Sequence, residues 1–353
     1  MAGVAHQFVA DTAPNLSVVE QHCDAAIRAT GRTSASPLFF ERRMFSDGIL
    51  SLPDGARVPY WGFEDPSGAT GHRSMPSPLI RMREGETAQV RLDMRRGKHS
   101  TQARSETRGG RGDALSIESF DTHIYRWKPK AAGTWLYQHH ASTAEDFEMG
   151  LFGLLVVDPE PDASGRGRAY KNGPSYDVEQ FWVFDDLDPA WHTGECDAAA
   201  SRAAGTQRVF DPKYFLINGV ANTQATQHPD VAITANVGDQ VLIRMVNASF
   251  SLVKISLEHF SGDIVSVDGS AIDVASCPWK SWIPVHPDKP IFMSTGSRHD
   301  LLIDLDPARN PCIPGHTYKF TFEFLDWANR SVRNSSATAP VNIGRAVTTL
   351  TVI

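Results

Sequence analysis

The sequence is poor in cysteine and lacks the features that direct a chain to nucleic acid or through a membrane. Four cysteines occur among 353 residues, without a CxxC pair or another spacing typical of zinc sites. No stretch approaches the roughly 20 consecutive apolar residues that a membrane-spanning helix needs, which predicts no membrane partner. The formal net charge of -7 argues against nucleic acid as a partner, because nucleic-acid binders more often carry a basic excess.

The start of the chain has neither the basic segment nor the apolar core of a secretory signal peptide. We therefore expect a cytoplasmic location, although a mature exported chain would give the same sequence. In a reducing cytosol the cysteines are expected to be free thiols. In an oxidising compartment Cys277 and Cys312 could pair, because they fall in the same predicted domain.

What the chain does contain is a long series of short apolar segments. From Leu38 onward these segments alternate with period two and are broken by Gly and Pro, which is typical of β-sandwich strands. The clearest candidates are 79–83, 88–93, 122–127, 133–139, 150–157, 178–184, 214–217, 241–247, 251–257, 264–267, 301–305, 318–324 and 347–353.

The pattern predicts two β-sandwiches in tandem. Residues 1–36 are expected to form a peripheral segment, 37–160 the first domain and 174–353 the second. The polar, Gly-rich stretch 161–173 is expected to be a linker.

Several segments resemble one known family. The runs AGTWLYQHH (132–140) and FEMGLFGLLVVDP (147–159) resemble the first-domain signature of the multicopper oxidases. Further segments in the second half, at 215–219, 237–249, 267–269 and 296–303, resemble the second domain of that family in the same order. The resemblance covers roughly residues 75–353. It implies an all-β protein of two tandem cupredoxin-like Greek-key β-sandwich domains, and a homo-oligomer such as a trimer, as in two-domain copper proteins.

The sequence departs from this family at the copper ligands. The family's His-Cys-His run is replaced by Gln138, His139 and His140, so a histidine stands at the thiolate position. A later ligand histidine is replaced by Asp146, and Met149 alone keeps its identity. The resemblance thus places the former blue-copper pocket at Arg96, His139, Asp146 and Met149. Because the soft thiolate is central to a blue-copper centre, we expect a divergent protein without one.

The two faces of the predicted strand at 136–140 suggest different roles. Alternate residues of a strand face opposite ways, so His139 points away from Gln138 and His140. On the His139 side, an Arg96–Asp146 ion pair would fill the former pocket, since a buried charge needs a partner. On the other side, His99 and His140 are candidate ligands of a single metal ion, with copper as the cofactor that the resemblance suggests.

Three functions remain open from the sequence. The first is a repurposed enzyme acting on a small molecule in the former copper cleft, with His140, Asp146 and Glu148 as acid–base groups. The second is a non-catalytic binding or scaffold protein, which requires the vacated site to be filled by side chains. The third is a copper-dependent oxidoreductase with an unusual mononuclear site, which requires stoichiometric copper.

Overall fold

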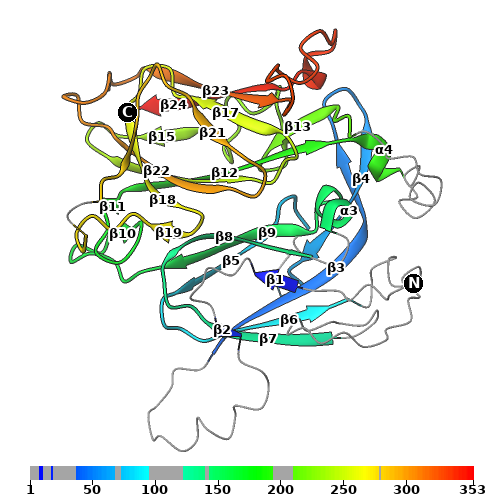
Figure 1. Cartoon of the computed structure of the whole chain (residues 1–353), viewed down its shortest axis with the longest axis horizontal. Coiled ribbons are helices and arrows are strands. Elements are labelled where there is room, and N and C mark those ends of the chain that lie inside the picture. The colour runs from blue at the N-terminus through cyan, green and yellow to red at the C-terminus, as the bar shows by residue number, and fades with distance from the viewer. Residues whose placement is uncertain are drawn as a thin grey trace, which may run out of the picture. The chain divides into compact units, whose positions relative to one another are not determined.

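Strands dominate the part of the chain that the computed structural model describes (Figure 1). That part comprises residues 8–10, 17–18, 37–67, 73–94, 122–139, 143–193, 210–277 and 280–353. The chain divides into two compact units. Unit 1 consists of Met1–Gly48 and Tyr60–Glu160, and unit 2 of Ile49–Pro59 and Pro161–Ile353. The helices in the described ranges are short, and none combines the length and apolar character that a bilayer crossing requires.

Unit 1 contains two sheets. The four-stranded sheet has the order β1 (Phe8–Ala10), β8 (Gly133–His139), β9 (Phe152–Asp158) and β5 (Ser77–Arg83). The five-stranded sheet has the order β2 (Ser17–Val18), β7 (Thr122–Lys128), β6 (Ala88–Asp93), β3 (Leu38–Ser51) and β4 (Arg57–Glu64). The helix α3 (Thr143–Glu148) follows β8 in the chain.

The core of unit 1 draws on both sheets. Ile80 and Leu155 come from the four-stranded sheet and Val90 from the five-stranded one, and all three are fully buried in one cluster. The segment 1–36, which the sequence predicts to be peripheral, supplies β1 and β2. These strands pair antiparallel with β8 and β7 and so extend both sheets.

Unit 2 contains two larger sheets and one small hairpin. The first sheet has the order β14 (Val220–Ala221), β13 (Tyr214–Ile217), β12 (Val178–Leu187), β16 (Gln240–Asn247), β22 (Arg298–Asp304), β18 (Gly262–Val267) and β19 (Ser270–Ala271), with β20 (Ile283–Val285) also paired to β18. The second has the order β15 (Ile233–Ala235), β24 (Arg345–Val352), β23 (Thr317–Leu325), β17 (Leu252–Ser256) and β21 (Ile291–Met293). The remaining elements are β10 (Gly167–Arg168), β11 (Ser175–Tyr176), α4 (Pro189–His192) and a 3-10 turn at Pro340–Asn342.

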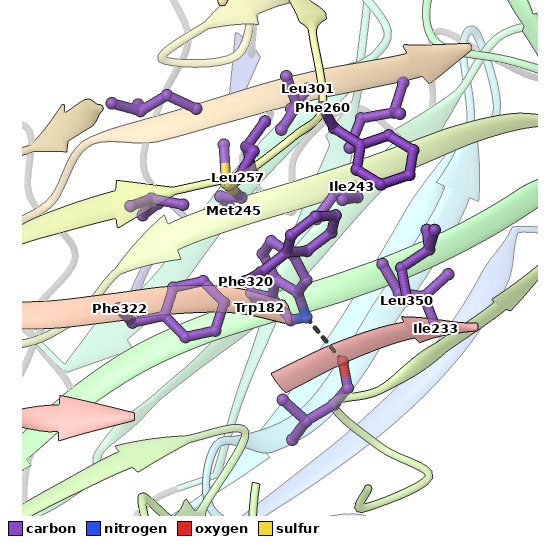
Figure 2. Close-up of a cluster of buried hydrophobic side chains, with 14 of the residues drawn as sticks. Trp182, Ile233, Ile243, Met245, Leu257, Phe260, Leu301, Phe320, Phe322 and Leu350 are labelled. Carbon is purple, nitrogen blue, oxygen red and sulfur yellow. Dashed lines mark hydrogen bonds between the residues drawn. The ribbon is translucent and has the colours of Figure 1, made fainter. Parts of the chain in front are cut away.

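The core of unit 2 is built around Trp182 (Figure 2). Its ring packs edge-on against Phe320 and Phe322 of β23, with ring centroids 5.9 and 4.9 Å apart. The indole Nε1 donates a hydrogen bond to the carbonyl of Val231 at 2.9 Å, so the polar atom of this buried side chain is satisfied.

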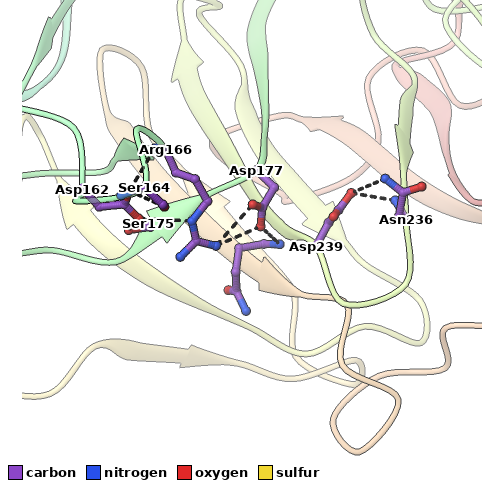
Figure 3. Close-up of polar contacts among 8 residues, drawn as sticks. Asp162, Ser164, Arg166, Ser175, Asp177, Asn236 and Asp239 are labelled. Carbon is purple, nitrogen blue, oxygen red and sulfur yellow. Dashed lines mark hydrogen bonds and ion pairs between the residues drawn. The ribbon is translucent and has the colours of Figure 1, made fainter.

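The stretch 161–173, which the sequence predicts as a linker, is part of unit 2. Asp162 accepts hydrogen bonds from the backbone and hydroxyl of Ser164 and from the hydroxyl of Ser175 (Figure 3). These bonds hold the pKa of Asp162 below its usual value. Arg166 pairs with both Asp162 and Asp177. This polar, Gly-rich stretch therefore forms a hydrogen-bonded turn rather than a free connector.

The tip of the β3–β4 hairpin, residues 49–59, also belongs to unit 2. Tyr214 donates its hydroxyl to Asp54 at 3.0 Å. The ring Nδ1 of His192 lies 2.6 Å from the carbonyl of Pro59, which can only accept. The two strands thus run from one unit into the other, although the sequence places the whole of 37–160 in the first domain.

Candidate functional site

A buried histidine and a buried aspartate occupy the end of β8 and the helix that follows it. His139 is the last residue of β8 and Asp146 lies in α3. Their side chains are 1% and 2% exposed, and His139 Nδ1 lies 2.7 Å from Asp146 Oδ2. An ionised carboxylate only accepts, so Nδ1 is then the donor. The distance is that of a charge-assisted hydrogen bond.

The backbone after α3 fixes the position of this pair. The amide of His139 donates to the carbonyl of Leu151 at 2.9 Å, and the amide of Leu151 donates to the carbonyl of Asp146 at 3.0 Å. Met149 lies within the same turn and is also buried. The turn therefore holds His139 and Asp146 together through the main chain as well as through their side chains.

Gly150 is required by this turn. Its φ is 102°, a conformation that side chains disfavour. A Cβ atom at this position would lie 2.7 Å from the carbonyl oxygen of Trp61. The backbone of Trp61 lies this close to Gly150 because the amide of Trp61 donates a hydrogen bond to the carbonyl of Met149 at 2.7 Å. The Met-Gly step of the motif thus joins the turn to β4.

The structure describes some of the predicted site residues and not others. It brings His139 and Asp146 into contact and places Met149 in the same buried turn. Glu148 is 1% exposed. Arg96, His99 and His140 lie outside the described residues, so the predicted Arg96–Asp146 ion pair and the His99–His140 metal site stay predictions.

The described residues contain no group of three or more His, Cys, Asp or Glu side chains arranged to hold a metal ion. Within the same ranges, Cys277 and Cys312 are free thiols in unit 2. Burial raises the pKa of the Cys312 thiol, which makes it a poorer nucleophile. Neither cysteine lies in the segment that forms the His139–Asp146 site.

A groove in unit 2 was not predicted from the sequence. It has a volume of about 760 Å³ and lies against β17, β21 and β23. The side chain of Trp327 is 42% exposed and lines the groove. No local motif marks the groove, because the pairing of strands far apart in the sequence assembles it. We call this feature the outer groove.

Comparisons with known proteins give sequence matches over part of the chain. No family model matches the chain. Copper resistance protein A of Escherichia coli is 29% identical over 102 residues, covering 26% of this chain and 16% of that protein. Laccase-2 of Cryptococcus neoformans var. grubii is 27% identical over 149 residues, covering 39% of this chain and 24% of that protein. The matched segments thus span less than a quarter of either relative.

Solved structures with a similar fold cover nearly the whole chain. They include the blue copper oxidase of Nitrosomonas europaea (TM-score 0.60, 18% identity, 90% of this chain and 86% of that one). The multicopper oxidase mgLAC is similar to the same extent (TM-score 0.60, 19% identity, with the same coverage). The copper nitrite reductase of N. europaea is also similar (TM-score 0.55, 17% identity, 89% of this chain and 94% of that one). These likenesses confirm the predicted fold: the chain has the cupredoxin-type β-sandwich fold of the multicopper-oxidase structures.

Proposed function

We propose that this chain is a copper-independent binding protein that keeps the multicopper-oxidase fold. The observation that supports this most directly is the buried His139–Asp146 pair. It stands where the resemblance places a copper thiolate and a ligand histidine. Two polar side chains that satisfy each other can fill such a pocket without a metal.

The residues of the pair do not fit a blue-copper centre. Such a centre needs a cysteine thiolate, and position 139 is a histidine. Two ligand atoms bound at about 2 Å in a tetrahedral site lie roughly 3.3 Å apart. The 2.7 Å separation of His139 Nδ1 and Asp146 Oδ2 is shorter and favours a direct hydrogen bond.

Burial also argues against turnover at this position. A general acid or base must come within hydrogen-bond reach of the reacting group. Asp146 and Glu148 are both buried, so a substrate in solution would not reach them without rearrangement. The repurposed-enzyme hypothesis then depends on His140, which lies outside the described residues.

Metal content tests the proposal. The purified chain is incubated separately with copper, zinc, iron and manganese salts, desalted and analysed by mass spectrometry. We expect substoichiometric metal in every case. About one equivalent of copper would contradict the proposal.

Two variants identify the source of any copper that is found. Loss of the copper in His140→Ala, but not in the control His259→Ala, which removes an exposed histidine of unit 2, would favour a mononuclear copper oxidoreductase. As a positive control, the triple variant Arg96→His/His139→Cys/Asp146→His restores a thiolate and two histidines beside Met149, at the positions that the resemblance gives. Copper uptake with intense visible absorption in this variant would indicate that the pocket lacks ligands and not space.

A further inference from the structure

A row of charged side chains crosses three adjacent strands at the outer groove. The strand register places Lys254 of β17 opposite Phe292 of β21 and opposite Glu323 of β23. Lys254 Nζ pairs with Glu323 Oε2 at 2.8 Å. Glu323 Oε1 also pairs with Arg345, which is opposite Glu323 on β24. The carboxylate in the groove is therefore already shared between two cations.

The apolar part of the groove is formed by aromatic and aliphatic side chains. Leu252 and Leu325 are buried and lie opposite each other on β17 and β23. Phe292, on the edge strand β21, is 51% exposed. Trp327 provides a second aromatic surface. A groove with this volume and with apolar walls is of the kind that binds small molecules.

The turn that carries Trp327 is fixed before any ligand binds. The indole Nε1 of Trp327 donates to the carbonyl of Phe250 at 2.7 Å. Asp326 Oδ1 accepts from the amides of Ala328 and Asn329 at 2.8 and 3.2 Å. An isolated bridge between Leu325 and Val332 closes the turn. Because the wall is preorganised, a ligand would lose little affinity to ordering it.

Arg330 supplies a positive charge at this wall. Its guanidinium carbon lies 5.3 Å from the centroid of the Trp327 ring, which holds the guanidinium plane by a cation–π contact. Within the described residues no carboxylate lies within ion-pair distance of Arg330, whereas Lys254 is paired with Glu323. The N–H groups of a guanidinium bind a carboxylate bidentately. The charge balance of the lining thus favours an anion.

We propose that the outer groove binds a small planar aromatic carboxylate. The ring would lie on Phe292 and the two leucines, Leu252 and Leu325, and the carboxylate would bind Arg330. This inference rests on the proposed binding function and gives it a site and a ligand class. The two can fail separately, because metal content tests one and ligand affinity tests the other.

Calorimetric titration of the full chain tests the proposal with cinnamate and its neutral analogue cinnamamide. We expect cinnamate to bind at one saturable site and cinnamamide to bind about tenfold or more weakly, since a hydrogen bond to a charged group is involved. Arg330→Gln should weaken cinnamate about tenfold and leave cinnamamide unchanged. The affinity of Arg330→Lys for cinnamate should fall between those of the unmodified chain and of Arg330→Gln, because an ammonium cannot bind bidentately.

Two further variants complete the design. Phe292→Ala should weaken both compounds, because it removes the ring surface. Arg309→Gln is the matched control: this arginine pairs with Asp263 and Asp304 and does not line the groove. The Arg309→Gln protein should bind cinnamate with the same affinity as the unmodified chain. The proposal is overturned if cinnamate shows no saturable binding, if both compounds bind equally, or if Arg330→Gln has no more effect than Arg309→Gln.

Discussion

Asp186 and His192 are two buried titratable side chains of unit 2. Protonation of these two groups changes the stability of the fold in opposite directions. Burial raises the pKa of Asp186 to about 6, against hydrogen bonds from Ser251 and from the amide of Phe250. Burial lowers the pKa of His192 to about 4. The folded chain therefore favours the neutral form of both groups. Neither residue was singled out from the sequence, because their burial follows from tertiary packing.

The signs follow from the order of the folded and unfolded pKa values. Asp186 has its ordinary value of 3.8 when unfolded and about 6 when folded. The folded state binds more protons between these values, so this group's contribution to stability is lost as pH rises from about 4 to 6. His192 has its ordinary value of 6.5 when unfolded. Its contribution is present above that value and is lost as pH falls towards about 4.

We predict that Asp186→Asn gains stability relative to the unmodified chain as pH rises. The free energy of unfolding of Asp186→Asn, relative to that of the unmodified chain, should rise by about 1–3 kcal/mol between pH 4 and pH 7. Urea unfolding at several pH values measures it. His192→Gln should move in the opposite direction across the same range. A difference that does not vary with pH for Asp186→Asn would mean that this carboxyl is ionised throughout.

Among the elements, the turn between α3 and β9 depends most clearly on one residue. We predict that Gly150→Ala lowers the free energy of unfolding by about 2–4 kcal/mol, because it combines an unfavourable φ with a steric clash. The matched control is Gly85→Ala in the same unit. Gly85 has a φ of 76°, and the nearest atom to its added Cβ is 3.9 Å away.

The Gly85→Ala variant measures the cost of a side chain at positive φ without a steric clash. Gly85→Ala should cost only about 1 kcal/mol in a urea unfolding experiment. Equal losses in the two variants would show that the approach of Trp61 to the turn is not required for stability.

Some short strands are predicted with the correct bounds. The ranges expected at 88–93, 133–139 and 214–217 match β6, β8 and β13 at both ends. The long strand β3 was not predicted as one element, because its burial alternates irregularly along 14 residues. Its tip packs in a different unit from its start, so no single apolar face runs along it.

The site could be predicted only in part. The motif places His139 and Asp146 on one side of the fold, but the hydrogen bond between them depends on the turn at Gly150. The outer groove could not be predicted at all. Lys254, Phe292 and Glu323 are neighbours through strand register, and register between distant strands leaves no local signal in a single sequence.

At the scale of the whole molecule, each unit has its own hydrophobic core. We predict two transitions in differential scanning calorimetry, because two cores need not unfold together. Leu155→Ala in unit 1 and Leu301→Ala in unit 2 both remove a fully buried side chain. Each should cost about 2–5 kcal/mol and lower the midpoint of one transition.

The two variants serve as controls for each other. They should affect different transitions, and the unaffected transition should keep its midpoint. A single transition that both substitutions lower would mean that the units unfold as one cooperative body.

The path of residues 49–59 limits how this gene can be divided. A fragment that begins at Pro161 would lack Asp54 and Pro59, which bind Tyr214 and His192 in the intact chain. The buried His192 would then lose the Pro59 carbonyl that accepts its ring N–H. A continuous fragment of residues 1–160 would carry the same hairpin tip without its binding surface. Recombinant expression of either unit therefore requires the hairpin to be transplanted or shortened, and exchange of one unit between related genes requires three crossovers, at 48/49, 59/60 and 160/161.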